Sequence, residues 1–97
     1  MTELNIAEIP YEDSAIRYRY ARYMSKDGTR WIRHGLFLSY YPNGVLSSEG
    51  TYADGEEQGL WTVYHPNGKM AARGRYENGK EVGPWEFWDD DGSPSAE

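Results

Sequence analysis

The chain has 97 residues and a formal net charge of −6 at pH 7, which allows one small domain with a modest core. The absence of cysteine excludes disulfides and thiolate metal sites, and no segment is apolar over a length that could span a membrane. The N-terminus lacks the basic start and apolar run of a secretory signal, so we expect a cytoplasmic protein. Nine tyrosines, four tryptophans and eleven glycines favour short strands and tight turns over helices.

Charge is distributed unevenly along the chain. Residues 1–16 carry four acids, residues 17–34 carry six basic side chains and one acid, and residues 35–97 carry four basic and eleven acidic side chains. An acidic main body disfavours nucleic acid and anionic membranes as partners and favours basic proteins. The alternative is an acidic surface that serves only solubility.

The N-terminal third divides into two segments. Residues 1–15 are interpreted as an N-terminal extension, whose apolar side chains could cover part of a sheet face. Residues 16–34 are interpreted as a divergent first hairpin, because its IRYRY start alternates apolar or aromatic residues with arginines. Arginines interleaved with tyrosines resemble a nucleic-acid surface, but an exposed strand face with salt bridges to the acidic body is the favoured interpretation.

A repeat of 24 residues begins at residue 35. Full units cover 35–58 and 59–82, a partial unit covers 83–92, and residues 93–97 form a tail. Each unit starts with a glycine and has an aromatic ring two residues later, and glycines recur in register at its turns. The aligned starting glycines and rings are Gly35, Gly59 and Gly83, and Phe37, Trp61 and Trp85.

Each full unit contains two turn signals. Asn43-Gly44 and Asn67-Gly68 follow prolines, whereas Asp54-Gly55 and Asn78-Gly79 close the opposite end. Such pairs accept positive φ at both central positions, as type I′ hairpin turns require. The turns leave about eight to ten residues between them, a normal strand length. We therefore predict an all-β fold, a single antiparallel meander of about six strands, at 16–24, 29–41, 45–53, 57–65, 69–77 and 81–88.

Two-residue turns would also fix the register of the strands. Trp61 should lie opposite Gly74 and rest on its bare backbone, with Ser48 opposite Trp61 on the other side. By the same count His65 should face Met70. Replacing Gly74 by valine should then clash with Trp61 and cost about 1–3 kcal/mol of stability.

The repeat pattern, G-x-[FW]-x-x-Y-x-P-N-G followed by G-x-Y-x-[DN]-G-x-x-x-G, resembles the MORN-repeat variant family over residues 35–88. Members of that family often form the antitoxin half of bacterial toxin–antitoxin pairs. The resemblance implies a β-hairpin array that binds other proteins, with immunity or antitoxin activity. The first half-unit departs from the pattern, because Ser25-Lys26-Asp27-Gly28 lengthens its turn and arginines are dense there.

Side chains that could carry chemistry are few. His34 and His65 belong to no recognisable base–nucleophile arrangement, so we expect no enzyme activity, cofactor or metal. Asp89-Asp90-Asp91-Gly92 could suggest calcium, but the rest of a twelve-residue calcium loop is missing. The segment aligns with Tyr41-Pro42-Asn43-Gly44, and a solvated final turn is the favoured interpretation.

A partner-binding surface is expected on the second sheet face, where an aromatic row lies among charges. The row can be an ordinary cross-strand ladder, or an anchor for a partner, because tyrosine, tryptophan and arginine are enriched at binding hot spots. The predicted partner-binding residues are Tyr40, Tyr64, Trp88, Arg73, Arg75, Glu86, Asp89, Asp90 and Asp91.

These patterns predict a small immunity or antitoxin protein that binds a cognate protein toxin and occludes its active site. The acids of residues 35–97 would oppose a basic cleft on that toxin. The alternative is a structural or scaffold module that self-associates or docks through its sheet, and a homo-oligomer fits that alternative. Membranes are not expected as partners, because anionic headgroups would repel the acidic body.

Overall fold

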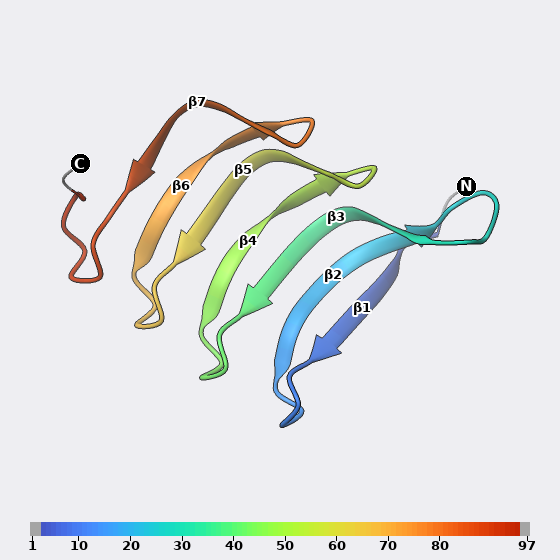
Figure 1. Ribbon diagram of the computed structural model, residues 1–97, viewed down its shortest axis with the longest axis horizontal. Helices are drawn as coiled ribbons and strands as arrows, with labels where there is room; N and C mark the ends of the chain where they lie inside the picture. The colour runs from blue at the N-terminus through green and yellow to red at the C-terminus, as the bar shows by residue number, and fades with distance from the viewer. Residues whose placement is uncertain (1–2, 96–97) are drawn as a thin grey trace.

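Seven antiparallel strands follow one another in sequence order to form one open sheet, which confirms the predicted all-β meander (Figure 1). The structure, a computed structural model, describes residues 3–95. The molecule is essentially one sheet thick, with extents of 47 × 36 × 17 Å. The strands are β1 (Asn5–Pro10), β2 (Ile16–Met24), β3 (Trp31–Tyr40), β4 (Leu46–Ala53), β5 (Glu56–Tyr64), β6 (Met70–Glu77) and β7 (Lys80–Phe87).

Strand β1 was not predicted. Its residues extend the sheet as an edge strand beside β2, and they do not fold over a face as a cover. The turn that follows has the form of the later proline turns: the Tyr11 amide donates to the Ala15 carbonyl at 2.7 Å, and Ser14 takes a φ of 77°. Because Ser14 stands where the later turns have glycine, this first copy of the repeat carries no Asn-Gly signal.

The two ends of each unit have different turns. Asp54 and Gly55 both have positive φ, 50° and 91°, which confirms the two-residue type I′ turn. At the proline end the loop has three residues, since the Tyr41 amide donates to the Val45 carbonyl at 2.8 Å and, within the loop, Gly44 alone has positive φ. The type I′ prediction was wrong there, because proline favours a type I turn that a glycine then closes.

This longer loop shifts the local register by one residue. Tyr64, not His65, pairs with Met70, and a bulge between Val63 and Tyr64 restores the predicted pairing of Trp61 with Gly74. A second, larger bulge lies between β4 and β5, where residues 59–61 oppose one residue of β4. It moves Ser48 opposite Val63, so the predicted pairing of Ser48 with Trp61 was also wrong.

The large bulge brings each indole over a glycine of the preceding hairpin. A Cβ atom added to Gly50 would lie 2.1 Å from Trp61, and one added to Gly74 would lie 2.1 Å from Trp85. The prediction that Gly74 seats Trp61 was therefore wrong. Trp61 pairs with Gly74 along the backbone, but its ring crosses back over β4.

These rings form a ladder that serves as the core of the sheet. Neighbouring centroids are 5.3 to 5.9 Å apart, mostly in edge-to-face arrangements. Phe37 and Trp61 are each only 7% exposed, although no second layer of residues 3–95 covers them. The ladder, which defines the aromatic face, consists of Tyr20, Phe37, Tyr52, Trp61, Tyr76 and Trp85.

Candidate protein-binding surface

The opposite face, called here the polar face, carries a row of mainly charged side chains across every strand. Directly opposed residues of antiparallel strands project to the same side, so the register places these side chains in one line. Arg19 Nε lies 2.7 Å from Glu8 Oε2, and Arg73 Nη2 lies 3.0 Å from Glu86 Oε1. In order, the charged row is Glu8, Arg19, Leu38, Glu49, Thr62, Arg73 and Glu86.

Two of the predicted binding residues contact this charged row. The Tyr64 hydroxyl donates to Glu49 Oε1 at 2.7 Å, and this bond raises the pKa of Tyr64 because it favours the protonated phenol. The Arg73 guanidinium lies 5.9 Å from the ring centroid of Trp88. Tyr64 and Trp88 therefore present apolar rings beside fixed charges.

The rings of Tyr40, Tyr64 and Trp88 do not form a cross-strand ladder. Tyr40 ends β3, Tyr64 ends β5 and Trp88 follows β7, so an intervening strand separates each pair. With neighbouring strands about 4.8 Å apart, the rings recur at intervals of roughly 10 Å. Residues 3–95 show no ring contact among the three, which leaves them as separate, spaced anchors.

The remaining predicted residues fall into two groups. Arg73, Arg75 and Glu86 line one shallow hollow of about 400 Å³ on the polar face, beside Leu60. Residues 89–91 lie apart from it, in the exposed turn after β7. The structure thus brings three charged side chains together and places the acidic run at the end of the sheet.

That acidic run forms the predicted turn. The Asp89 amide donates to the Ser93 carbonyl at 2.8 Å, and Asp91 Oδ1 accepts from the Ser93 amide and hydroxyl at 2.9 and 2.6 Å. The hydroxyl bond lowers the pKa of Asp91 most. Within the described chain, no group of three or more histidine, aspartate or glutamate side chains could hold a metal ion.

Side chains at the proline turns tie successive hairpins together, which sequence reasoning missed. The Tyr11 hydroxyl donates to the Tyr40 carbonyl at 2.7 Å, and the Tyr41 hydroxyl donates to the Tyr64 carbonyl at 2.5 Å. His65 Nε2 bonds the carbonyl of Trp88 at 2.8 Å in the same way. His65 therefore has a structural role. The alignment of His65 with Tyr41 in the repeat was the sequence feature that could have indicated it.

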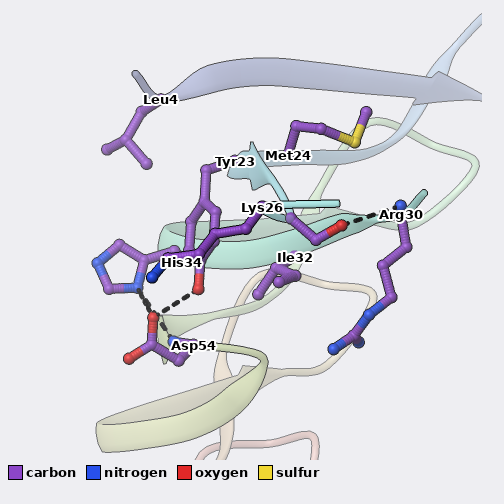
Figure 2. A pocket seen from close by; sticks show the side chains of 9 residues that line it. Leu4, Tyr23, Met24, Lys26, Arg30, Ile32, His34 and Asp54 are labelled. Atoms are coloured by element: carbon purple, nitrogen blue, oxygen red, sulfur yellow. Dashed lines mark hydrogen bonds and ion pairs between the residues drawn. The ribbon is translucent and has the colours of Figure 1, made fainter. Parts of the chain in front are cut away.

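His34 also serves a turn. Its Nδ1 accepts the Asp54 amide at 3.0 Å, and Gln58, one repeat later, accepts the Asn78 amide at 2.9 Å with its side-chain oxygen. His34 borders a second hollow of about 570 Å³ beside the lengthened β2–β3 turn (Figure 2). The lengthened turn is visible in the sequence, but the hollow beside it was not predicted.

Comparison with known proteins supports the family resemblance. Residues 33–54 and 57–78 match the family model described as MORN repeat variant. Two adjacent matches support the MORN-repeat family, whose repeats are binding and structural units, and they suggest a protein-interaction module. No curated protein and no solved structure matches the chain. Between residues 3 and 95 there is no helix with the length and apolar character needed to cross a membrane.

Proposed function

We propose that this chain is an immunity or antitoxin protein that binds a cognate toxin through the polar face and occludes its active site. The observation that carries the proposal is the alternation of spaced rings with charges along one edge of that face. Tyr64 stands against Glu49, and Trp88 stands under Arg73. Rings held beside hydrogen-bonded charges are typical of the few residues that dominate binding energy at interfaces.

The charge of the repeats supports a toxin with a basic cleft. Residues 35–97 carry eleven acidic and four basic side chains, and the turn at residues 89–91 places three acids at one exposed end. Charge complementarity would speed encounter with a basic cleft, and burial of Tyr64 and Trp88 would slow dissociation. Both histidines are engaged by backbone groups of turns, which supports a role in binding over catalysis.

Co-expression with the product of the adjacent gene tests the proposal. We expect a complex that protects cells from that product, and loss of protection when Tyr64 and Trp88 are both replaced by alanine. Phe87→Ser is the matched control, because this ring is 55% exposed but lies on the aromatic face. Absence of both a complex and protection for the natural chain would reject the antitoxin role.

A structural module that self-associates is the second candidate. It is favoured by the exposed aliphatic side chains of the polar face, Ile6, Leu36 and Leu60, which are 62%, 58% and 49% exposed. Light scattering across a hundredfold dilution measures the outcome directly. A stable homo-oligomer that Leu36→Ser and Leu60→Ser dissociate would support this candidate, and a monomer at all concentrations would reject it.

A further inference from the structure

The turn between β2 and β3 differs from its counterparts in the repeats. Met24 pairs with Trp31, so six residues, 25–30, stand where Asp54-Gly55 forms a two-residue turn. The Ser25 amide donates to the Arg30 carbonyl at 2.9 Å, and the Gly28 amide donates to the Ser25 carbonyl at 2.9 Å. The insertion is therefore an ordered turn.

The carboxylate of this turn is used inside it. Asp27 Oδ1 accepts the Ser25 hydroxyl at 2.6 Å, the Thr29 hydroxyl at 2.7 Å and the Thr29 amide at 3.1 Å. Lys26 and Arg30 flank it, both exposed, and neither has an ion-pair partner within residues 3–95. The Asp27 carboxylate is thus hydrogen-bonded within the turn, whereas the Lys26 and Arg30 side chains are exposed to solvent.

Those cations border the hollow of about 570 Å³ shown in Figure 2. Leu4, Met24 and Ile32 give it apolar walls. On another side Tyr23, His34 and Asp54 turn toward one another: the Tyr23 hydroxyl donates to Asp54 Oδ1 at 2.7 Å, an atom 3.4 Å from His34 Nδ1. The Asp54 carboxylate therefore already has a hydrogen-bond partner, whereas the Lys26 and Arg30 side chains are available to a ligand.

We propose that this hollow binds an acidic segment of a partner protein. An aliphatic side chain of the segment enters between Leu4, Met24 and Ile32, and a neighbouring carboxylate meets Lys26 and Arg30. The occupant follows from charge complementarity, because Lys26 and Arg30 border the hollow and have no ion-pair partner within residues 3–95. The three apolar side chains make up only part of the lining, which suits a segment that combines an aliphatic side chain with a carboxylate. The site goes beyond the proposed antitoxin function, since it lies away from the acidic end and requires no toxin.

Titration of the isotope-labelled full chain with the peptide Ac-Asp-Leu-Asp-Leu-Asp-amide, followed by NMR, tests the proposal. We expect saturable shifts at the amides of Tyr23, Met24, Ile32 and His34. Three probes serve as controls: the same peptide with lysine for aspartate, the same peptide with serine for leucine, and acetate. Equal binding of the lysine peptide, or of the serine peptide or acetate, would overturn the proposal.

Variants locate the site. Lys26→Ser and Arg30→Ser should each weaken the acidic peptide about threefold, the size expected for an exposed ion pair. Lys80→Ser, an exposed cation at the other end of the sheet, should leave affinity unchanged. Replacing residues 25–30 by Asp-Gly should keep the sheet, because Met24 and Trp31 already flank the position of a two-residue turn, and should abolish binding.

Three further results would overturn the proposal. Unchanged affinity in the Asp-Gly variant, or no shifts at any peptide concentration, would overturn the proposal. Shifts at the same amides when the chain alone is concentrated would assign the hollow to a second copy, against the proposal. Protection from the toxin is measured separately, so failure of the antitoxin role and failure of this site are distinguishable.

Discussion

At the scale of single residues, Gly50 and Gly74 determine how the single sheet formed by residues 3–95 protects its core. An indole from the next hairpin lies directly on each glycine backbone, so the ring is covered from below by main chain and from the sides by tyrosines. A side chain at either glycine would lift the ring off the sheet. The contact also joins neighbouring hairpins, because ring and glycine belong to different repeats.

Gly74→Ala should therefore destabilise the protein by about 1–3 kcal/mol, the cost of overpacking. The added Cβ atom would lie 2.1 Å from Trp85. Urea unfolding measures the loss. A double-mutant cycle should show coupling of Gly74→Ala with Trp85→Ala and little with Trp61→Ala. Coupling to Trp61 alone would contradict the arrangement of the rings.

The two indoles should respond differently to replacement by phenylalanine. Trp61 Nε1 donates to the Thr51 carbonyl at 3.1 Å, whereas Trp85 Nε1 is buried and has no partner in the described chain. Trp61→Phe loses a hydrogen bond worth about 1 kcal/mol, whereas Trp85→Phe removes an unsatisfied donor. Thermal unfolding should show the larger loss for Trp61→Phe, and the reverse order would refute this assignment.

His34 should be replaceable by glutamine but not by alanine. The repeat itself places Gln58 in the same role, accepting the amide of the first turn residue. We expect His34→Gln to unfold within a few tenths of a kcal/mol of the natural chain, and His34→Ala to lose about 1 kcal/mol. The reciprocal change, Gln58→His, is the control. A large loss for His34→Gln would assign His34 another role.

At the scale of elements, the turns explain what sequence could and could not predict. Asp54-Gly55 and Asn78-Gly79 have the predicted conformation because the sequence signal is local and steric. The three-residue proline loops and the bulges were missed. The extra residue in each loop is offset by a bulge in the adjoining strand pair, and no local sequence signal marks that bulge. Strand β1 was missed because Ser14 and Ala7 replace the glycine and the ring that mark later units.

The face of the sheet on which several candidate side chains lie was predicted from the sequence, whereas their role in binding stays a prediction. Alternation along strands places Tyr64, Arg73 and Glu86 on one face, and their contacts confirm that placement. The hollow beside residues 25–30 could not be predicted, because it depends on an insertion with no repeat partner and on Leu4, which precedes strand β1. The repeat pattern predicts features that every unit shares, and this insertion occurs in one turn.

The lengthened turn should loosen in acid. Hydrogen bonds from Ser25, and next from Thr29, lower the pKa of Asp27 to about 2, below the value near 3.9 of an unfolded chain. Its stabilising contribution is thus complete above about pH 4 and is lost as the pH falls through about 2. The Thr29 amide shift should titrate with a midpoint of about 2, and Asp27→Asn should abolish that transition. A midpoint near 4 would contradict the hydrogen-bonded turn.

At the scale of the whole molecule, the sheet is a linear array in which each strand contacts its sequence neighbours. Removing residues 59–82 should leave a folded protein, because Gly83 then follows Gln58 as Gly59 does now, and Trp85 can lie on Gly50. We expect cooperative urea unfolding with an m-value lower by roughly a quarter, in proportion to the surface lost.

Removal of half a unit provides the control for that deletion. Deleting residues 59–70 would join strands out of phase and would separate the indole from its glycine, so the product should not give a cooperative transition. Equal behaviour of the two deletions would show that the period of 24 residues is irrelevant to folding. Failure of the full-unit deletion alone would mean that the ends of the array depend on the missing repeat.

The spacing of Tyr40, Tyr64 and Trp88 has a consequence for how such a chain could change over generations. Each added unit would lengthen the row by one ring in a step of roughly 10 Å, leaving the chemistry of existing contacts untouched. The length of the row and its number of rings could then vary by duplication of the repeat alone. The number of repeats could therefore be adjusted to the length of a partner's surface before any single side chain had to change.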